Sequence, residues 1–205
     1  MKSLSSNFLV PAIGGCVIVT FSLLFYFDYT RAATAGNQKE IGTITFKQQS
    51  AQRKFQAQVI WEEVEQSMKV YSYDTIRTSE RSGAIIKLHD GTEIKLSENS
   101  MILLSFSKDE IGINFMRGSI KAKRGDLKGK GLKKLNIISK KMKVSIDKSD
   151  ISLSKDKSNE LNLTIDKGDA KIKKGDKETT LKKNQKLVIS KDDIKVFNIT
   201  LKLIS

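Results

Sequence analysis

The 205-residue chain contains one cysteine, one proline and one histidine. A single cysteine excludes an intrachain disulfide framework, and with one histidine it excludes a Cys/His zinc site. One histidine also leaves little room for a Ser-His-Asp or Cys-His catalytic site. The scarcity of proline, beside abundant Ile, Leu and Val, argues against a disordered Pro-rich chain. We therefore expect a folded protein that is not an enzyme and uses no metal or other cofactor.

The charge of the chain is strongly basic and unevenly placed. Lys and Arg number 37 against 23 Asp and Glu, a formal net charge of +14. Residues 1–116 hold 12 of each sign, so residues 117–205, with 25 basic and 11 acidic residues, carry the whole excess. Such asymmetry indicates either an anionic partner or the solvated faces of strands, where lysine also blocks edge-to-edge pairing.

Nucleic acid is a poor match for this basic half, because one aromatic residue and two arginines offer little for stacking on bases. No small-molecule substrate is indicated either. Anionic phospholipid, lipopolysaccharide or cell-wall carboxylates remain as partners of lysines that share one strand face. The candidate contacts are Lys128, Lys130, Lys133, Lys134, Lys171, Lys173, Lys174, Lys182 and Lys183.

Residues 8–27 form an uncharged run of twenty residues. A helix of that length is about 30 Å long, which matches the hydrocarbon core of a bilayer. Pro11 falls in the first turn of such a helix, where a missing N–H has little effect. We expect a transmembrane anchor at 8–27, a short N-terminus at 1–7 and a polar linker at 28–40.

Two other interpretations of this segment stay open. A signal peptide could be cleaved after Ala33-Thr34-Ala35, although the apolar run is longer than usual. Alternatively, Ile13-Gly14-Gly15-Cys16 resembles a lipobox whose cysteine would carry lipid, although apolar residues follow Cys16. The few basic residues on the two sides of the run are nearly balanced and do not decide the orientation.

Beyond residue 40 the dominant hydrophobic period is two, which is typical of half-buried antiparallel strands. Alternating stretches occur at 111–115, 142–146, 151–153, 161–165, 170–172 and 194–196. Turn signals such as Arg117-Gly118 and Lys167-Gly168-Asp169 separate them. The pattern predicts an all-β sandwich, roll or solenoid.

One hairpin can be assigned a register. A three-residue loop at His89-Asp90-Gly91 would pair Ile86 with Ile94 and Ala84 with Leu96, which keeps apolar side chains opposite one another. Gly91 would then adopt the left-handed conformation of a bulged turn. His89 is expected to be an exposed turn residue rather than a ligand.

Several motifs resemble the periplasmic domain of the FecR family. After Trp61 come a D-x-I-x-T element (Asp74, Ile76 and Thr78), a D-G-[ST]-x-[IV]-x-L strand beginning at Asp90-Gly91, and an N-S-x-[IL] turn at Asn99-Ser100. The stretch 163–172 resembles the later hairpin of the family, and Asn184-Gln185 stands where a Gly-Gln pair is usual. Tyr73 replaces a glycine before the aspartate, so we expect that turn to differ.

The resemblance implies a twisted antiparallel β-solenoid or roll-like domain over 41–205, facing the periplasm and held at the inner membrane. Only residues 1–7 precede the apolar run, so the cytoplasmic anti-sigma region of such proteins is not carried over. We expect a sensor, binding or scaffold module that contacts an envelope protein or an anionic component. The alternatives are a signal-transduction regulator of the iron-sensor type and an enzyme acting on envelope polysaccharide.

Overall fold

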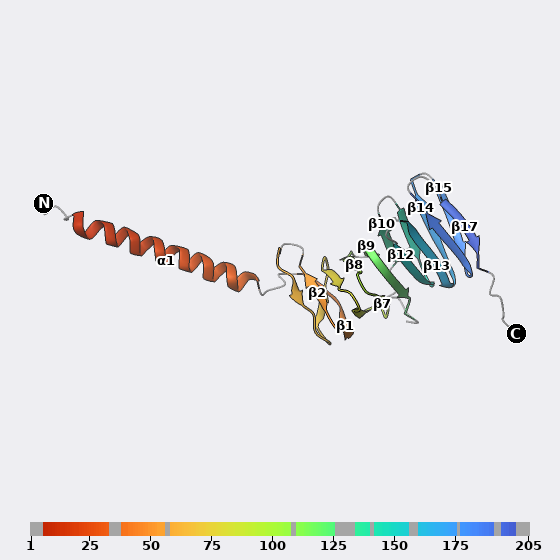
Figure 1. Cartoon of the computed structure of the whole chain (residues 1–205), viewed down its shortest axis with the longest axis horizontal. Coiled ribbons are helices and arrows are strands. Elements are labelled where there is room, and N and C mark those ends of the chain that lie inside the picture. Colours follow the sequence, from red (N-terminus) through yellow and green to blue (C-terminus); the bar gives the residue numbers. More distant parts are fainter. Residues whose placement is uncertain are drawn as a thin grey trace. The chain divides into compact units, whose positions relative to one another are not determined.

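A computed structural model describes residues 6–32, 38–55, 58–107, 110–125, 134–139, 142–155, 160–175, 177–190 and 194–199. The chain divides into two compact units, 1–37 and 38–205 (Figure 1). Lys128, Lys130 and Lys133 of the candidate contacts lie outside the described residues.

The first unit contains one helix, α1 (Ser6–Ala32). Pro11 lies inside this helix. The described side chains, 11–27, are all exposed, and Phe25 reaches 74% exposure. Within the described part of the chain, no helix has both the length and the apolar character needed to cross a membrane.

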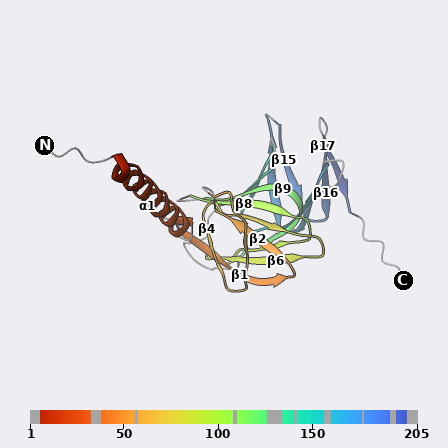
Figure 2. The same ribbon diagram turned by 60° about the vertical axis from the view of Figure 1, so that its left-hand side comes forward.

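The second unit is built from two sheets, shown from two sides in Figures 1 and 2. In order across sheet A lie β4 (Lys69–Tyr71), β1 (Glu40–Gln48), β6 (Gly83–Leu88), β7 (Glu93–Leu96), the second half of β9 (Glu110–Lys123), β12 (Asp150–Lys155), β13 (Leu161–Lys167), β16 (Gln185–Ile189) and β17 (Ile194–Asn198). In order across sheet B lie β3 (Glu62–Glu63), β2 (Ala51–Lys54), β5 (Thr75–Thr78), β8 (Met101–Phe106), the first half of β9, β10 (Lys134–Ser139), β11 (Met142–Ile146), β14 (Asp169–Lys174) and β15 (Lys177–Lys182). Neighbours are antiparallel except for the parallel pair of β9 and β10.

Strand β9 connects the two sheets. Its first half pairs with β8 and β10 in sheet B, and its second half pairs with β7 and β12 in sheet A. Gly118 lies at the change of sheet, with a φ of +88°. The expectation that Arg117-Gly118 ends a strand is therefore wrong: the glycine bends a 14-residue strand that continues on both sides.

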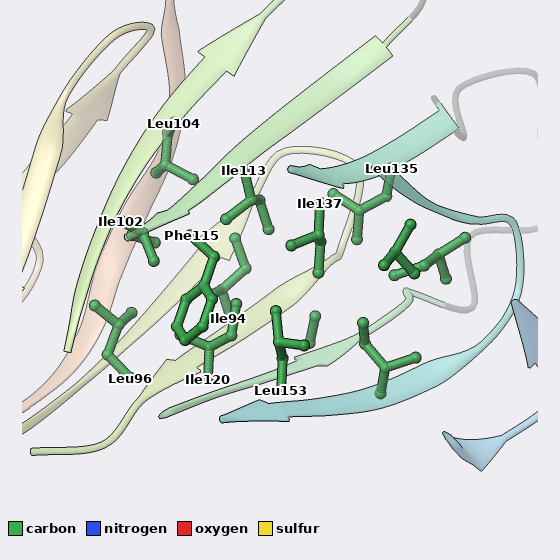
Figure 3. Close-up of a cluster of buried hydrophobic side chains, with 14 of the residues drawn as sticks. Ile94, Leu96, Ile102, Leu104, Ile113, Phe115, Ile120, Leu135, Ile137 and Leu153 are labelled. Carbon is green, nitrogen blue, oxygen red and sulfur yellow. The ribbon is translucent and has the colours of Figure 1, made fainter. Parts of the chain in front are cut away.

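The core lies between the inner faces of the two sheets. Strand alternation places every second side chain there, as in β6 and β13, where buried and less buried positions alternate. Figure 3 shows side chains from both sheets meeting, with Ile94, Leu96 and Leu153 from sheet A against Ile102, Phe115 and Ile137 from sheet B. Ile76 of the D-x-I-x-T element belongs to this core and is fully buried. Burial of each such side chain contributes about 1.5–3 kcal/mol.

The all-β expectation is confirmed for the second unit, whose sheets are open rather than closed into a barrel. A solenoid is not shown: the hairpins are distributed over two sheets, with β6–β7 and β12–β13 in sheet A and β8–β9, β10–β11 and β14–β15 in sheet B. The predicted register of the 84–96 hairpin is confirmed: Ala84 pairs with Leu96 and Ile86 with Ile94. Gly91 has a φ of +79°, and the side chain of His89 is 56% exposed.

Candidate functional site

Three of the motif residues fasten the bend of β9 to the neighbouring turns. Thr78 Oγ1 accepts a hydrogen bond from the Ser100 amide at 3.0 Å, and the hydroxyl donates to the Ser97 carbonyl at 2.5 Å. Ser100 Oγ lies 2.9 Å from both the amide nitrogen and the carbonyl oxygen of Ser119. Asn99 turns the chain with a φ of +54°. The Thr78 and Ser100 side chains therefore hold neighbouring segments of the fold together.

The Asp-Gly pair of the family motif has a similar internal role. Asp90 Oδ1 accepts the Thr92 amide at 3.0 Å, and Oδ2 accepts Arg124 Nη1 at 3.0 Å. Arg124 Nη1 also donates to Thr92 Oγ1 at 2.8 Å, and its Nε donates to the Asp147 carbonyl at 3.1 Å. The Arg124 and Asp90 side chains are 3% and 5% exposed. A Cβ on Gly125 would lie 2.7 Å from the Asp90 carbonyl oxygen, so this glycine lets the two segments meet.

Asp74 belongs to a buried charged cluster that the sequence did not reveal. Its Oδ2 accepts the Tyr71 amide at 2.8 Å and lies 4.0 Å from Arg53 Nη1. Arg53 also donates to the Lys69 carbonyl at 2.7 Å and to Glu62 Oε2 at 3.0 Å. Asp74 Oδ1 and Arg53 Nε are buried without a hydrogen-bond partner. Arg53 lies two residues after the buried Ala51 on β2. Because every second side chain of a strand faces the same side, this spacing is the sequence feature that indicates an inward-pointing Arg53.

Burial raises the pKa of Asp74 to about 6; the Tyr71 amide and the Arg53 charge oppose the rise, and Glu62 adds to it. In the unfolded chain the carboxyl has its ordinary pKa near 3.8. Between pH 4 and 6 the native state therefore holds more protons, so stability falls as pH rises through this window. Over the whole titration, from below pH 3.8 to above pH 6, this carboxyl lowers the free energy of unfolding by about 3 kcal/mol.

Substituting Asp74 with Asn should remove this dependence, because the amide oxygen can still accept the Tyr71 N–H and carries no charge. We expect the stability of the wild type relative to Asp74→Asn to decrease by about 2 kcal/mol from pH 4 to pH 6 in urea titrations. Comparing the two proteins cancels the opposite slopes of Glu40 and Glu63, whose pKa values are lowered by Lys69 and Lys47. A difference that stayed constant with pH would contradict the assignment.

Tyr73 corrects another expectation. The residue keeps the left-handed conformation of a glycine, with a φ of +70°, so the turn before Asp74 is preserved at the cost of strain.

We expect Tyr73→Gly to be more stable than Tyr73→Ala by about 1 kcal/mol in urea unfolding, because both lose the side chain and only alanine retains the strain. At Lys87 in β6 the order should reverse, since glycine weakens a regular strand. If alanine were the better residue at both positions, the strain at Tyr73 would be disproved.

Trp61 contacts cations on the outer face of sheet B. The Arg77 guanidinium carbon lies 3.9 Å from the ring centroid and Lys54 Nζ lies 5.4 Å from it. Gln52 Oε1 accepts from Arg77 Nε and Nη2 at 2.9 and 2.6 Å, which fixes the guanidinium. The Trp61 ring is half-buried, and its role is to pack against the Arg77 and Lys54 side chains on the surface.

The described candidate lysines do not all lie on one face of the protein. Lys171 and Lys173 are exposed and share the outer face of β14, as predicted, because Ala170 and Ile172 alternate with them in the core. Lys174 points the other way, with its Nζ 3.4 Å from the Ser190 carbonyl. Lys183 lies in the turn between β15 and β16.

Over β10, β11, β14 and β15 the outer face of sheet B carries five lysines, which we call the lysine face: Lys134, Lys143, Lys171, Lys173 and Lys182. Lys143, which the sequence did not single out, pairs directly with Lys173 across the strands. Glu110, Glu178 and Asp169 oppose Lys134, Lys173 and Lys182. The balance of five lysines and three carboxylates gives this face a charge of 5 − 3 = +2.

Comparisons with known proteins agree with this architecture. A family model described as "FecR protein" matches residues 74–185. An "Uncharacterized protein" of Treponema pallidum (strain Nichols) is 32% identical over 79 residues, which cover 38% of this chain and 12% of that protein. The chain therefore spans about an eighth of the length of this curated relative.

Two crystal structures of a "putative anti-sigma factor" from Parabacteroides distasonis ATCC 8503 resemble this chain with TM-scores of 0.52 and 0.53. The sequences are 12% identical, and the match covers 60% of this chain and 59% of the other. At that identity the likeness concerns the fold alone. The family match takes in more than half of the chain and contains the Asp74–Thr78 element, the Asp90-Gly91 hairpin and the Asn99-Ser100 turn. The chain belongs to the FecR protein family.

Proposed function

We propose that this protein is a non-enzymatic binding module of the cell envelope, a sensor or scaffold that contacts an envelope protein or an anionic envelope component. The family match over 74–185 carries the proposal. The motif residues make internal contacts, so the contact surface lies on outward-facing side chains of the sheets. The lysine face is the candidate surface for anions.

The proposal includes a single-pass anchor in the inner membrane with the β unit in the periplasm. The support is the run at 8–27 within α1, which contains no charged residue and has about the length that spans the hydrocarbon core of a bilayer. The FecR resemblance supplies the orientation.

Cysteine labelling tests this topology. In a Cys16→Ser background, we would introduce Lys173→Cys in the β unit and, as its matched control, Ser3→Cys before the helix. We expect a membrane-impermeant maleimide to label position 173 once the outer membrane is permeabilised, and to reach position 3 only after the cells are lysed. Equal labelling of both positions before lysis would reject the topology. The intact mass of the purified chain distinguishes an uncleaved anchor from a cleaved or lipidated one.

Binding to purified peptidoglycan sacculi tests the anionic partner. For the detergent-solubilised full chain, we expect Lys171→Gln/Lys173→Gln to weaken co-sedimentation roughly 30-fold at low salt, from about 1 kcal/mol per lysine. The control Lys87→Gln/Lys95→Gln removes two exposed lysines of sheet A and should leave binding unchanged. Absence of binding by the wild type would remove the cell-wall carboxylates and leave anionic lipids or an envelope protein as the partner.

A second candidate function is signal transduction of the iron-sensor type. The description of the Parabacteroides protein with the similar fold as a "putative anti-sigma factor" favours it. Deleting residues 2–7, the segment before the apolar run, should then change a discrete set of transcripts under iron limitation. An unchanged transcript profile would count against this role.

A further inference from the structure

Strand β17 forms an edge of sheet A with unusual properties. Among the described strands it pairs with β16 alone. Val196 faces the same side as its partner Leu187, which is fully buried, yet Val196 is 45% exposed. The core is therefore open at this end of the two sheets. Phe197 on the outer side is 49% exposed, and Ile199 just beyond the strand is 39% exposed.

The other edges of the described sheets carry the usual protection against pairing. Strands β3 and β4 contain two and three residues, and β15 contains three charged residues among six. Short or charged edges prevent unwanted strand addition. By contrast, β17 has five residues, no proline, no glycine and a single charge, Lys195. An apolar edge of this kind is suited to pairing with another strand.

The hydrogen-bonding pattern shows which backbone groups face outward. The Ile199 amide donates to the Asn184 carbonyl at 2.7 Å. In an antiparallel ladder hydrogen-bonded pairs alternate, so Phe197 bonds to Lys186, while the amides and carbonyls of Val196 and Asn198 point away from β16. These groups match the spacing that an added strand requires.

The charge near β17 indicates what kind of strand could pair with this edge. Lys186 lies opposite Phe197 on the outer face, and neither β16 nor β17 contains a carboxylate. A second copy would add a chain of the same +14 charge to this edge. A strand that alternates apolar and acidic side chains would instead cover Val196 on one face and meet Lys186 on the other.

We propose that β17 is a docking edge for an extended acidic segment of another protein, which joins sheet A as an additional antiparallel or parallel strand. Backbone hydrogen bonds to Val196 and Asn198 give the affinity, and the alternation of apolar and acidic residues gives the selectivity. This edge is separate from the lysine face of sheet B, so it stands or fails independently of anion binding there.

The test uses the detergent-solubilised full chain and a fluorescent peptide of seven residues in which glutamate and valine alternate. We expect this peptide to bind at least tenfold more tightly than one in which lysine replaces glutamate. Val196→Pro should weaken binding tenfold or more, because proline removes only an amide that faces the open edge and is tolerated there. Amide hydrogen exchange should slow at Val196 and Asn198 when the peptide binds.

Charge variants and the oligomeric state complete the test. Lys186→Glu should weaken binding of the acidic peptide several-fold, while the matched control Lys182→Glu on β15, and Lys171→Gln/Lys173→Gln on the lysine face, should not. Equal binding of the acidic and basic peptides, or retention of binding by a folded Val196→Pro variant, would overturn the proposal. A stable dimer that Val196→Pro dissociates would overturn it too, because a second copy would then occupy the edge.

Discussion

Arg124→Met should lower the free energy of unfolding by about 3–5 kcal/mol, because it leaves the Asp90 carboxylate buried without its cation. The substitution preserves much of the side-chain volume, so the loss reports on charge and hydrogen bonding rather than on a cavity. Asp90 and Thr92 both lose the same donor, Nη1 of Arg124. Urea unfolding followed by circular dichroism measures the effect.

Two controls separate burial from charge. Lys121 lies near the end of β9, three residues before Arg124, and Lys121→Met removes an ion pair with Asp166 at 2.6 Å. The two side chains are 42% and 32% exposed, so the expected loss is below about 1 kcal/mol. Combining Arg124→Met with Asp90→Asn should recover a large part of the stability, because the stranded charge disappears. Equal costs for Arg124→Met and Lys121→Met would show that the Asp90 pair is not a special anchor of the fold.

The Asp90–Arg124 pair shows which features of the fold can be predicted from the sequence and which cannot. The sequence predicts the turn at Asp90-Gly91 and the register of its hairpin correctly, because apolar alternation and glycine conformation are local properties. The partner, Arg124, lies 34 residues later and enters only through tertiary packing. Nothing in the neighbouring residues distinguishes this arginine from an exposed one.

Local patterns were reliable for the strands as well. The stretches predicted at 142–146, 161–165 and 170–172 lie in β11, β13 and β14. The sheet to which each strand belongs could not be derived, since pairs such as β9 with β12 join distant segments. The inward position of Arg53 and the burial of Asp74 have the same non-local origin.

Candidate lysines show a further limit. Alternation correctly placed Lys171 and Lys173 on one face, but it gave no information about the strands that lie beside them. Those strands supply Lys143 and the opposing Glu178, so the local charge is much smaller than the +14 of the basic half suggests. The number of lysines in a segment therefore overstates the field that a ligand would meet.

Gly118→Ala should be the most damaging glycine substitution in the chain's described β unit, with a loss of about 2–5 kcal/mol. Two effects add: alanine is strained by about 1–2 kcal/mol at a φ of +88°, and its Cβ would overlap Ser100 Cα and lie 2.7 Å from the Asn99 carbonyl oxygen. Both neighbours are backbone atoms held by the Thr78 and Ser119 hydrogen bonds, so they cannot move aside cheaply.

Gly175→Ala provides the matched control, because Gly175 also has a positive φ, +59°, and nothing lies within 4 Å of a Cβ placed there. It should cost only the conformational strain, about 1–2 kcal/mol, and the difference between the two variants then isolates the steric overlap at the bend. Because β9 connects the two sheets at Gly118, the loss should appear as one cooperative shift of the whole β unit in thermal unfolding. If Gly118→Ala lost no more stability than Gly175→Ala, the Ser100 backbone would have to move away from the new Cβ. The proposal that the Asn99-Ser100 turn holds the bend of β9 in place would then be refuted.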